Sequence, residues 1–256
     1  MKHATSVKPL IYMLLLSLLS CTSATQPLVV GHRGARGHVA ENTVASIKKA
    51  MELGVDGIEI DVFLCASGEL VVFHDKTLEK LTDAEGYIES LTLDSIQKIT
   101  VLGREPIPTL DEVLDVINGA VTLNIELKGT QTAKPTAALL KKYFDQGKLV
   151  PEDVFISSFD WSELKLFYAA TQTQVVRIAV LTEDDPLDAI PIAKGLNAFA
   201  INPDFRSLTK KNVKKIHQAN LAIYTWTVNE PEDIQRMKAL GVDAIITDYP
   251  ERIYPQ

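Results

Sequence analysis

The chain has 256 residues, of which 46% are hydrophobic, and it carries a formal net charge of −7 at pH 7. A chain of this length and composition can bury one large core, so we expect a single main domain. The negative charge argues against binding to nucleic acid and against a polybasic membrane patch, because both require clustered positive charge.

The first twenty residues have the pattern of an export signal. Lys2 and Lys8 precede an apolar run over residues 10–19, which is shorter than the roughly 20 residues needed to span a bilayer. We therefore predict a signal peptide at residues 1–20. Its removal, with the two lysines, would change the net charge from −7 to −9.

The apolar run ends in the sequence LLSC at residues 18–21, which resembles the lipobox of bacterial lipoproteins. This predicts a lipid anchor on Cys21, a tether over residues 21–27 and a domain over residues 28–256. The protein would then be exported and anchored to the bacterial cell envelope, facing the periplasm. The alternative is an ordinary cleaved signal with an incidental cysteine. Cys65, the only other cysteine, would lack a disulfide partner, and we expect it to be buried.

Apolar, β-rich runs alternate with helical patterns along the rest of the chain. The eight candidate strands are Leu28–Gly31, Gly57–Asp61, Val121–Glu126, Val154–Phe159, Val176–Leu181, Ala198–Asn202, Ala222–Thr227 and Ala244–Thr247. This alternation predicts an α/β fold with a closed parallel barrel. A doubly wound open sheet is the competing architecture, but no GxGxxG motif opens a helix after a strand.

Several polar residues mark where helices begin. Thr109 with Glu112 and Asp160 with Glu163 have the spacing of a capping box. Asn42 is a suitable N-cap for the first helix after the first strand. We expect helices to start at these three places.

The segment DVFLCASGELVVFHD at residues 61–75 interrupts the alternation, because two β-rich runs flank Ser67-Gly68 with no room for a helix. It predicts a hairpin after the second strand. A two-residue loop would place His74 opposite Asp61. Residues 76–109 would then form a short insertion before the next helix.

Acidic side chains alternate along the second candidate strand. Glu59 and Asp61 are two residues apart, so they point to the same face, where the pair is costly without a cation between them. Glu126 followed by Lys128 repeats this alternation at the end of the next parallel strand. Oxygen ligands without clustered cysteine or histidine favour Ca²⁺ or Mg²⁺ over zinc.

The carboxyl ends of all strands in a parallel barrel meet at one rim, where active sites lie. We expect these residues at that rim: His32, Arg33, Glu59, Asp61, His74, Glu126, Lys128, Ser157, Ser158, Asn202 and Trp226. Two histidines that titrate near neutrality and two cations beside carboxylates suit a metal-assisted transfer on an anionic substrate. We interpret Asp248 as a structural cap after the last strand, and His38 as a residue of the first loop without a role.

Longer motifs make the chain resemble the glycerophosphodiester phosphodiesterases over nearly its whole length. They are HRG and ENT within residues 32–43, GIEIDV at 57–62, VVFHD at 71–75, IPTLDEVL at 107–114, NIELK at 124–128, TWTVN at 225–229 and GVDAIITDYP at 241–250. The resemblance implies a TIM barrel, with a small hairpin and insertion after the second strand. It also implies hydrolysis of glycerophosphodiesters to glycerol 3-phosphate and an alcohol with a divalent cation. One departure is Ala40, where members of the family usually have proline before Glu-Asn-Thr.

The resemblance also implies roles for individual residues. It implies His32 and His74 as the acid–base pair, Glu59, Asp61 and Glu126 as metal ligands, and Arg33 and Lys128 as phosphate contacts. Trp226, Glu41 and Asn42 are further candidates for substrate contacts. Which histidine is the acid, which cation is used, the preferred head group, a cyclic intermediate and the oligomeric state stay open.

Two other functions are compatible with these motifs. The first is a lysophospholipase D or sphingomyelinase D type of enzyme that acts on lipids with the same fold. An added apolar stretch near the barrel mouth would favour it, and the sequence shows none that we can place. The second is a lipid-anchored binding protein without turnover, which would be expected to lack some rim residues. An amidohydrolase barrel is less suitable, because it would have His-x-His after the first strand where this chain has HRG at residues 32–34.

Overall fold

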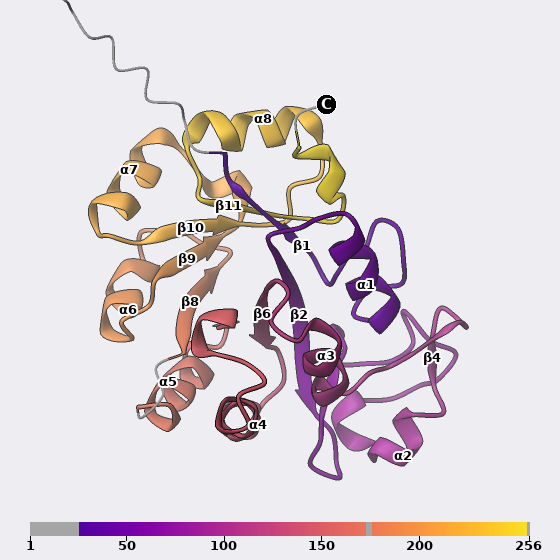
Figure 1. Ribbon diagram of the computed structural model, residues 1–256. Coiled ribbons are helices and arrows are strands. Elements are labelled where there is room, and N and C mark those ends of the chain that lie inside the picture. Colours follow the sequence, from indigo (N-terminus) through magenta and orange to yellow (C-terminus); the bar gives the residue numbers. More distant parts are fainter. Residues whose placement is uncertain (1–25, 173–175, 255–256) are drawn as a thin grey trace, which may run out of the picture.

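The computed structural model describes residues 26–172 and 176–254. A closed barrel of parallel strands forms its centre, because β1 pairs with both β11 and β2 (Figure 1). The eight barrel strands found within the described residues are β1 (Leu28–Gly31), β2 (Gly57–Leu64), β6 (Thr122–Leu127), β7 (Val154–Ser158), β8 (Arg177–Thr182), β9 (Ala200–Pro203), β10 (Ala222–Thr225) and β11 (Ala244–Thr247). Each corresponds to a predicted strand. The predicted (β/α)8 barrel is therefore confirmed.

Helices connect consecutive barrel strands and cover the outside of the barrel (Figure 1). Thr109 and Glu112 form the predicted capping box at the start of α3. The α-helices outside the insertion are α1 (Val44–Glu52), α3 (Leu110–Ile117), α4 (Ala133–Asp145), α5 (Trp161–Ala170), α6 (Ala189–Gly195), α7 (Lys210–Gln218) and α8 (Pro231–Leu240). Short 3₁₀ helices are η2 (Pro151–Asp153), η3 (Phe205–Ser207) and η4 (Pro250–Arg252).

The second predicted capping box is only half formed. Asp160 caps α5 by accepting the backbone N–H of Ser162 at 2.8 Å. The carboxylate of Glu163 instead accepts the backbone N–H groups of Gln131 and Ala133, at 2.9 and 2.8 Å. Because these N–H groups flank the start of α4, Glu163 stabilises the neighbouring helix rather than its own.

The barrel strands are buried on both faces. The interior is filled by Val30, Phe155, Ala179, Ala200, Tyr224, Ala244 and Ile246. On β2, Ile58 and Ile60 are fully buried in the layer between strands and helices. Since successive strand residues point to opposite faces, Glu59 and Asp61 face the barrel interior.

A hairpin follows β2, as predicted, because β3 (Leu70–Val72) pairs with it antiparallel. Its register differs from the prediction by one residue. Phe73, and not His74, lies opposite Asp61, since the Phe73 N–H donates to the Asp61 carbonyl at 3.1 Å. The loop has three residues, 66–68, and ends on Gly68 with φ of 99°. A left-handed third residue is typical of three-residue hairpin loops. The predicted register was wrong because it assumed a loop of two residues.

The predicted insertion, residues 76–109, forms a small lobe beside α3 (Figure 1). It contains η1 (Ile88–Ser90), α2 (Leu93–Ile96), β4 (Thr100–Val101) and β5 (Glu105–Pro106). A separate non-polar cluster joins this lobe to the hairpin and includes Phe73, Leu78 and Ile96. Cys65 lies in the same cluster and is buried, as expected.

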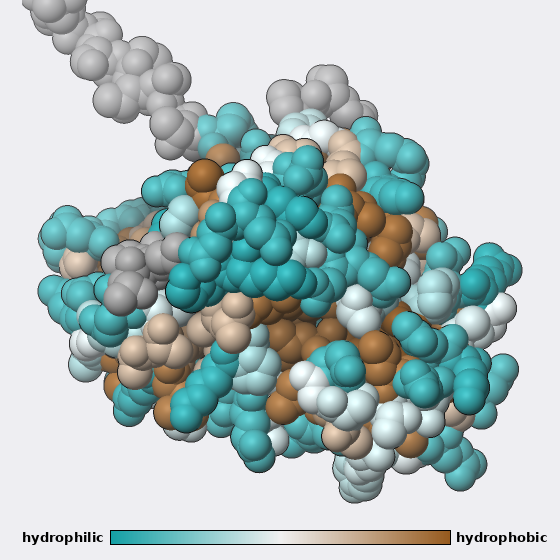
Figure 2. Space-filling view, turned by 60° about the horizontal axis from the view of Figure 1, so that its bottom comes forward, coloured by the Kyte–Doolittle hydropathy of each residue, from teal (hydrophilic) through white to brown (hydrophobic). Residues whose placement is uncertain are grey.

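Hydrophilic residues cover most of the face shown in Figure 2, around a central non-polar area. Among the described residues, no helix has the length and apolar character needed to cross a membrane. The predicted signal peptide at residues 1–20 and the predicted lipid anchor at Cys21 lie outside the described residues.

Candidate active site

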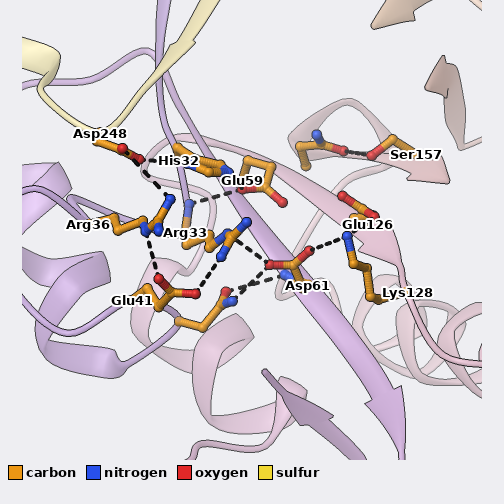
Figure 3. A network of polar contacts seen from close by, with 12 residues as sticks. His32, Arg33, Arg36, Glu41, Glu59, Asp61, Glu126, Lys128, Ser157 and Asp248 are labelled. Carbon is orange, nitrogen blue, oxygen red and sulfur yellow. Dashed lines mark hydrogen bonds and ion pairs between the residues drawn. The ribbon is translucent and has the colours of Figure 1, made fainter. Parts of the chain in front are cut away.

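Three carboxylates meet inside the barrel at the carboxyl ends of β2 and β6. Asp61 and Glu126 are partners in the parallel register, and Glu59 lies two residues before Asp61. One oxygen from each carboxylate lies within 4.8 Å of the other two. Figure 3 shows the three side chains pointing toward one another. The sequence therefore predicted correctly that these acids come together.

The three buried carboxylates shift each other's ionisation. Burial and the neighbouring charges of Asp61 and Glu126 raise the pKa of Glu59 well above its ordinary value. Burial and Asp61 raise the pKa of Glu126 to about 7. Burial would also raise the pKa of Asp61, but Arg33, His74 and Lys128 hold it below its ordinary value. Asp61 is the most readily ionised of the three.

Two cations contact this cluster but do not balance it. Lys128 Nζ lies 3.0 Å from Glu126 Oε1 and 3.8 Å from Asp61 Oδ1. Arg33 Nε lies 3.5 Å from Asp61 Oδ2. Three carboxylates beside two cations leave one negative charge when all three are ionised. Closely spaced carboxylate oxygens with this excess charge fit a hard divalent cation.

The loop between β1 and α1 brings Arg33 into the site. Arg33 has φ of 51°, and its backbone N–H donates to Glu59 Oε2 at 2.9 Å. Gly34 follows with φ of 85°, and a Cβ there would lie 2.4 Å from Ser46 Oγ. The glycine is required by this close approach of the loop to α1.

Asn42 does not cap α1. Thr43 is the N-cap, since its hydroxyl accepts the backbone N–H of Ser46 at 3.1 Å. Asn42 has φ of 57°, its side-chain amide donates to Asp61 Oδ2 at 2.8 Å, and its carbonyl oxygen accepts the Asp61 N–H at 3.3 Å. Asn and Thr are both common N-cap residues, so the sequence alone could not tell which of the two caps α1. The hydrogen bonds of Asn42 with Asp61 on β2 leave Thr43 as the cap.

Glu41 joins the two arginines of the same loop. Its carboxylate contacts the guanidinium of Arg33, and Arg36 Nε lies 2.6 Å from its other oxygen (Figure 3). Glu41 and Asn42 thus hold Arg33 and Asp61 from behind, whereas Arg33 itself lines the pocket.

His32 follows β1 and is buried in the pocket wall. Its Nδ1 lies 2.6 Å from Asp248 Oδ1, and its Nε2 lies 4.0 Å from Glu59 Oε2. Burial lowers the pKa of His32, and the hydrogen bond to Asp248 opposes that shift. Asp248 is therefore a partner of His32, and the interpretation of Asp248 as only a structural cap was wrong.

His74 reaches the same pocket from the end of the hairpin. Its Nδ1 lies 2.7 Å from Oδ1 of the adjacent Asp75. Burial and the positive charges of Arg33 and Lys128 lower the pKa of His74, although Asp61 opposes them. The structure thus brings both predicted histidines to one pocket despite the error in the hairpin register.

A largely non-polar wall completes the pocket opposite the charged residues. It is formed by Phe159, Leu181, Trp226 and Ile246, together with Glu183 and Thr227. The rings of Phe159 and Trp226 meet edge to face at 5.4 Å. Trp226 therefore lines the barrel mouth, as predicted, and its indole N–H donates to the backbone carbonyl of Asn202 at 2.8 Å.

Three other predicted rim residues take structural positions. Ser157 donates to Asn124 Oδ1 at 2.8 Å inside the barrel, and Ser158 donates to the Leu127 carbonyl at 2.7 Å. Asn202 is fully buried. The sequence did not indicate Phe159 or Glu183 as pocket residues, although Phe159 directly follows β7 and Glu183 directly follows β8.

The sequence matches proteins of known class over most of its length. The model of the glycerophosphoryl diester phosphodiesterase family matches residues 32–252. A glycerophosphodiester phosphodiesterase of Caldanaerobacter subterraneus subsp. tengcongensis is 35% identical over 236 residues, which cover 88% of this chain and 96% of that protein. One from Bacillus altitudinis is 31% identical over 235 residues, covering 88% and 95%.

Solved structures agree with the sequence matches. An Oleispira antarctica phosphodiesterase, in complex with the product sn-glycerol-3-phosphate, superimposes with a TM-score of 0.79 at 27% identity, covering 89% of this chain and 95% of that one. A glycerophosphodiester phosphodiesterase from Parabacteroides distasonis has a TM-score of 0.74 at 26% identity, covering 89% and 95%. Together with the pocket of histidines and clustered carboxylates, these matches show that the chain belongs to the glycerophosphoryl diester phosphodiesterase family and is an enzyme of that family.

Proposed function

We propose that the protein hydrolyses glycerophosphodiesters to sn-glycerol 3-phosphate and an alcohol, with a divalent cation and with His32 and His74 as the acid–base pair. The observation that carries this proposal is the placement of both histidines and three carboxylates around one pocket. The Oleispira antarctica structure, which holds sn-glycerol-3-phosphate, supports the same product class.

Glu59, Asp61 and Glu126 would hold the cation, which we expect to be Ca²⁺ or Mg²⁺ because all three donors are carboxylates. When bound, such a cation supplies positive charge to the phosphoryl oxygens. Lys128 and Arg33 offer N–H donors and positive charge to the remaining oxygens.

The two histidines would divide the proton transfers. One accepts a proton from the attacking oxygen while the other donates a proton to the leaving alcohol. The accepting imidazole is neutral before the step, which a lowered pKa favours near pH 7. The donating imidazole carries a second proton, on Nε2, which it gives to the leaving alcohol. Trp226 and the rest of the non-polar wall line the same pocket as the histidines, so this wall would pack against one arm of the diester and help to orient it for the reaction.

The test is release of glycerol 3-phosphate from glycerophosphocholine, glycerophosphoethanolamine and glycerophosphoglycerol, with Ca²⁺, Mg²⁺ or a chelator. We expect cation-dependent release, and a loss of about 10²- to 10⁴-fold in kcat for His32→Ala and for His74→Ala. Undiminished release in the presence of chelator, or a His74→Ala enzyme with most of its activity, would contradict the proposal. Faster turnover of lysophosphatidylcholine would favour the lysophospholipase D alternative.

We further propose that residues 1–20 are a signal peptide and that Cys21 bears lipid, which places the enzyme on the periplasmic side of the bacterial envelope. The support is the LLSC sequence after an apolar run. Incorporation of a labelled lipid precursor in the wild type and its loss in Cys21→Ala would test the anchor. Equal labelling of both proteins would contradict it.

A further inference from the structure

Each pocket histidine has a carboxylate on the same ring nitrogen. His32 Nδ1 lies 2.6 Å from Asp248 Oδ1, and His74 Nδ1 lies 2.7 Å from Asp75 Oδ1. The two carboxylates come from distant parts of the chain, since Asp248 follows β11 and Asp75 follows the hairpin after β2. The shared arrangement is therefore not a consequence of one local motif.

The two surface histidines among the described residues contact their carboxylates through the other ring nitrogen, Nε2. His38 Nε2 lies 3.0 Å from Glu251, and His217 Nε2 lies 2.9 Å from Asp243. Both pairs are exposed at the surface and lie outside the pocket. Contact through Nδ1 thus distinguishes the two pocket histidines from the two surface histidines.

The carboxylates are ionised and can only accept a hydrogen bond. Burial alone would raise the pKa of Asp248 and of Asp75, but hydrogen bonds from His32 and His74 keep both below the ordinary value. A neutral imidazole that donates from Nδ1 has its lone pair on Nε2. His32 lines the pocket together with Glu59, and its Nε2 lies 4.0 Å from Glu59 Oε2.

The two supporting carboxylates are held with different strength. Asp248 Oδ2 accepts an N–H of Asn229 at 2.8 Å, and the Asp248 backbone N–H donates to Asn229 Oδ1 at 2.9 Å. Asp75 Oδ2 has an ion pair with Lys80 at 3.0 Å, and the Lys80 side chain is largely exposed. Asp248 is therefore held by two hydrogen bonds with Asn229. Asp75 is held by an ion pair with an exposed lysine, which is a weaker kind of contact.

We propose that Asp248 and Asp75 are positioning residues, each of which holds its histidine in the tautomer that presents Nε2 to the substrate. This inference depends on the proposed roles of His32 and His74. Replacement of Asp248 by Asn preserves shape but offers an N–H to Nδ1, so His32 would shift to the tautomer with its hydrogen on Nε2.

Nitrogen-15 NMR of the Ca²⁺-loaded protein tests the tautomer directly. At about pH 8, where both imidazoles are neutral, we expect the Nδ1–H signature for His32 and His74, assigned from their loss in His32→Gln and His74→Gln. Asp248→Asn should convert His32 to the Nε2–H form. Glu251→Gln makes the matched change on the surface pair of His38 and should leave both pocket signatures unchanged. An Nε2–H signature for His32 in the wild type would overturn the proposal.

Kinetics separate this inference from the proposed function. We expect kcat to fall about 10²- to 10⁴-fold in Asp248→Asn with a smaller change in KM, because orientation of an acid or base acts on the transition state. Asp75→Asn should lose about tenfold, since the His74 side chain is partly exposed and water can accept its Nδ1–H in place of Asp75. Full activity of Asp248→Asn beside an inactive His32→Ala would overturn the positioning role alone.

Asp75→Asn keeps the proposal testable if Asp248→Asn fails to fold, because it probes the second pair independently. In that case, an unchanged His74 tautomer and unchanged kcat would overturn the proposal. If His32→Ala and His74→Ala both retain full turnover, the proposed function fails as well, whatever the tautomers are.

Discussion

The two halves of the barrel rim differ in the kind of residue that they contribute. Strands β1, β2 and β6, with the loops after them, carry the charged side chains, including Arg33, Asp61 and Glu126. Strands β7 to β11, with the loops after them, contribute a mostly non-polar wall that includes Phe159 and Trp226. Neighbouring strands of one barrel thus provide two environments within a single pocket.

This difference separates reaction from recognition. Buried charges are costly unless they are paired. In the first half, Asp61 contacts both Arg33 and Lys128, and Lys128 also contacts Glu126. Removal of one charged side chain there leaves its buried partner without an opposite charge. The non-polar half makes few polar contacts, so a change there removes packing surface and leaves the charged network intact.

Removal of one charge from the first half should have the largest effect. We expect Glu126→Gln to lower kcat/KM about 10³-fold or more, because it removes a proposed cation ligand and the partner of Lys128. Binding of Ca²⁺, measured by calorimetry, should weaken in parallel. Glu183→Gln is the matched control, since it makes the same change in the other half of the pocket. A loss of less than tenfold is expected there, and equal losses would remove the distinction between the halves.

The pH dependence of stability should also report the charged half. In the cation-free protein, the pKa of Glu126 is raised to about 7, so the folded state holds this proton more tightly than the unfolded chain does. The resulting stabilisation is complete below pH of about 4.5 and is lost as the pH rises through about 7.

Glu126→Gln isolates this effect from the two histidines, whose pKa values are lowered and whose contribution is lost as the pH falls. Thermal unfolding with chelator should therefore show wild type and variant close together at about pH 5. At about pH 8 the wild type should be less stable by several degrees, and added Ca²⁺ should restore it. A gap that is independent of pH would contradict the raised pKa.

The barrel was predictable because its signals are local. Each strand is a short apolar run between turn or cap residues, and Thr109 with Glu112 marks a helix start in the way the spacing indicates. The hairpin was predictable as an element, but its register was not. The paired residues of β2 and β3 are all apolar, so the sequence does not show whether the loop has two or three residues.

The site was predictable where its residues lie on strands. Alternation placed Glu59 and Asp61 on one face, and the parallel register brought Glu126 beside them. Loop residues were harder, since Asn42 and Asp248 act through hydrogen bonds to residues far away in the sequence. Both residues also have types and positions suited to capping nearby backbone, and the sequence therefore predicted capping roles for them.

The smallest effect is expected in the non-polar half, at Trp226. Trp226→Leu should raise KM about 5- to 10-fold with kcat changed about twofold or less, because it removes contact surface for one substrate arm without touching the acid–base pair. Trp226→Phe is the control: it also loses the hydrogen bond to the Asn202 carbonyl but keeps a ring against Phe159. Steady-state kinetics on glycerophosphocholine would measure both variants. A 100-fold fall in kcat at constant KM would instead place Trp226 with the charged residues, and recognition and reaction would then share the same side of the pocket.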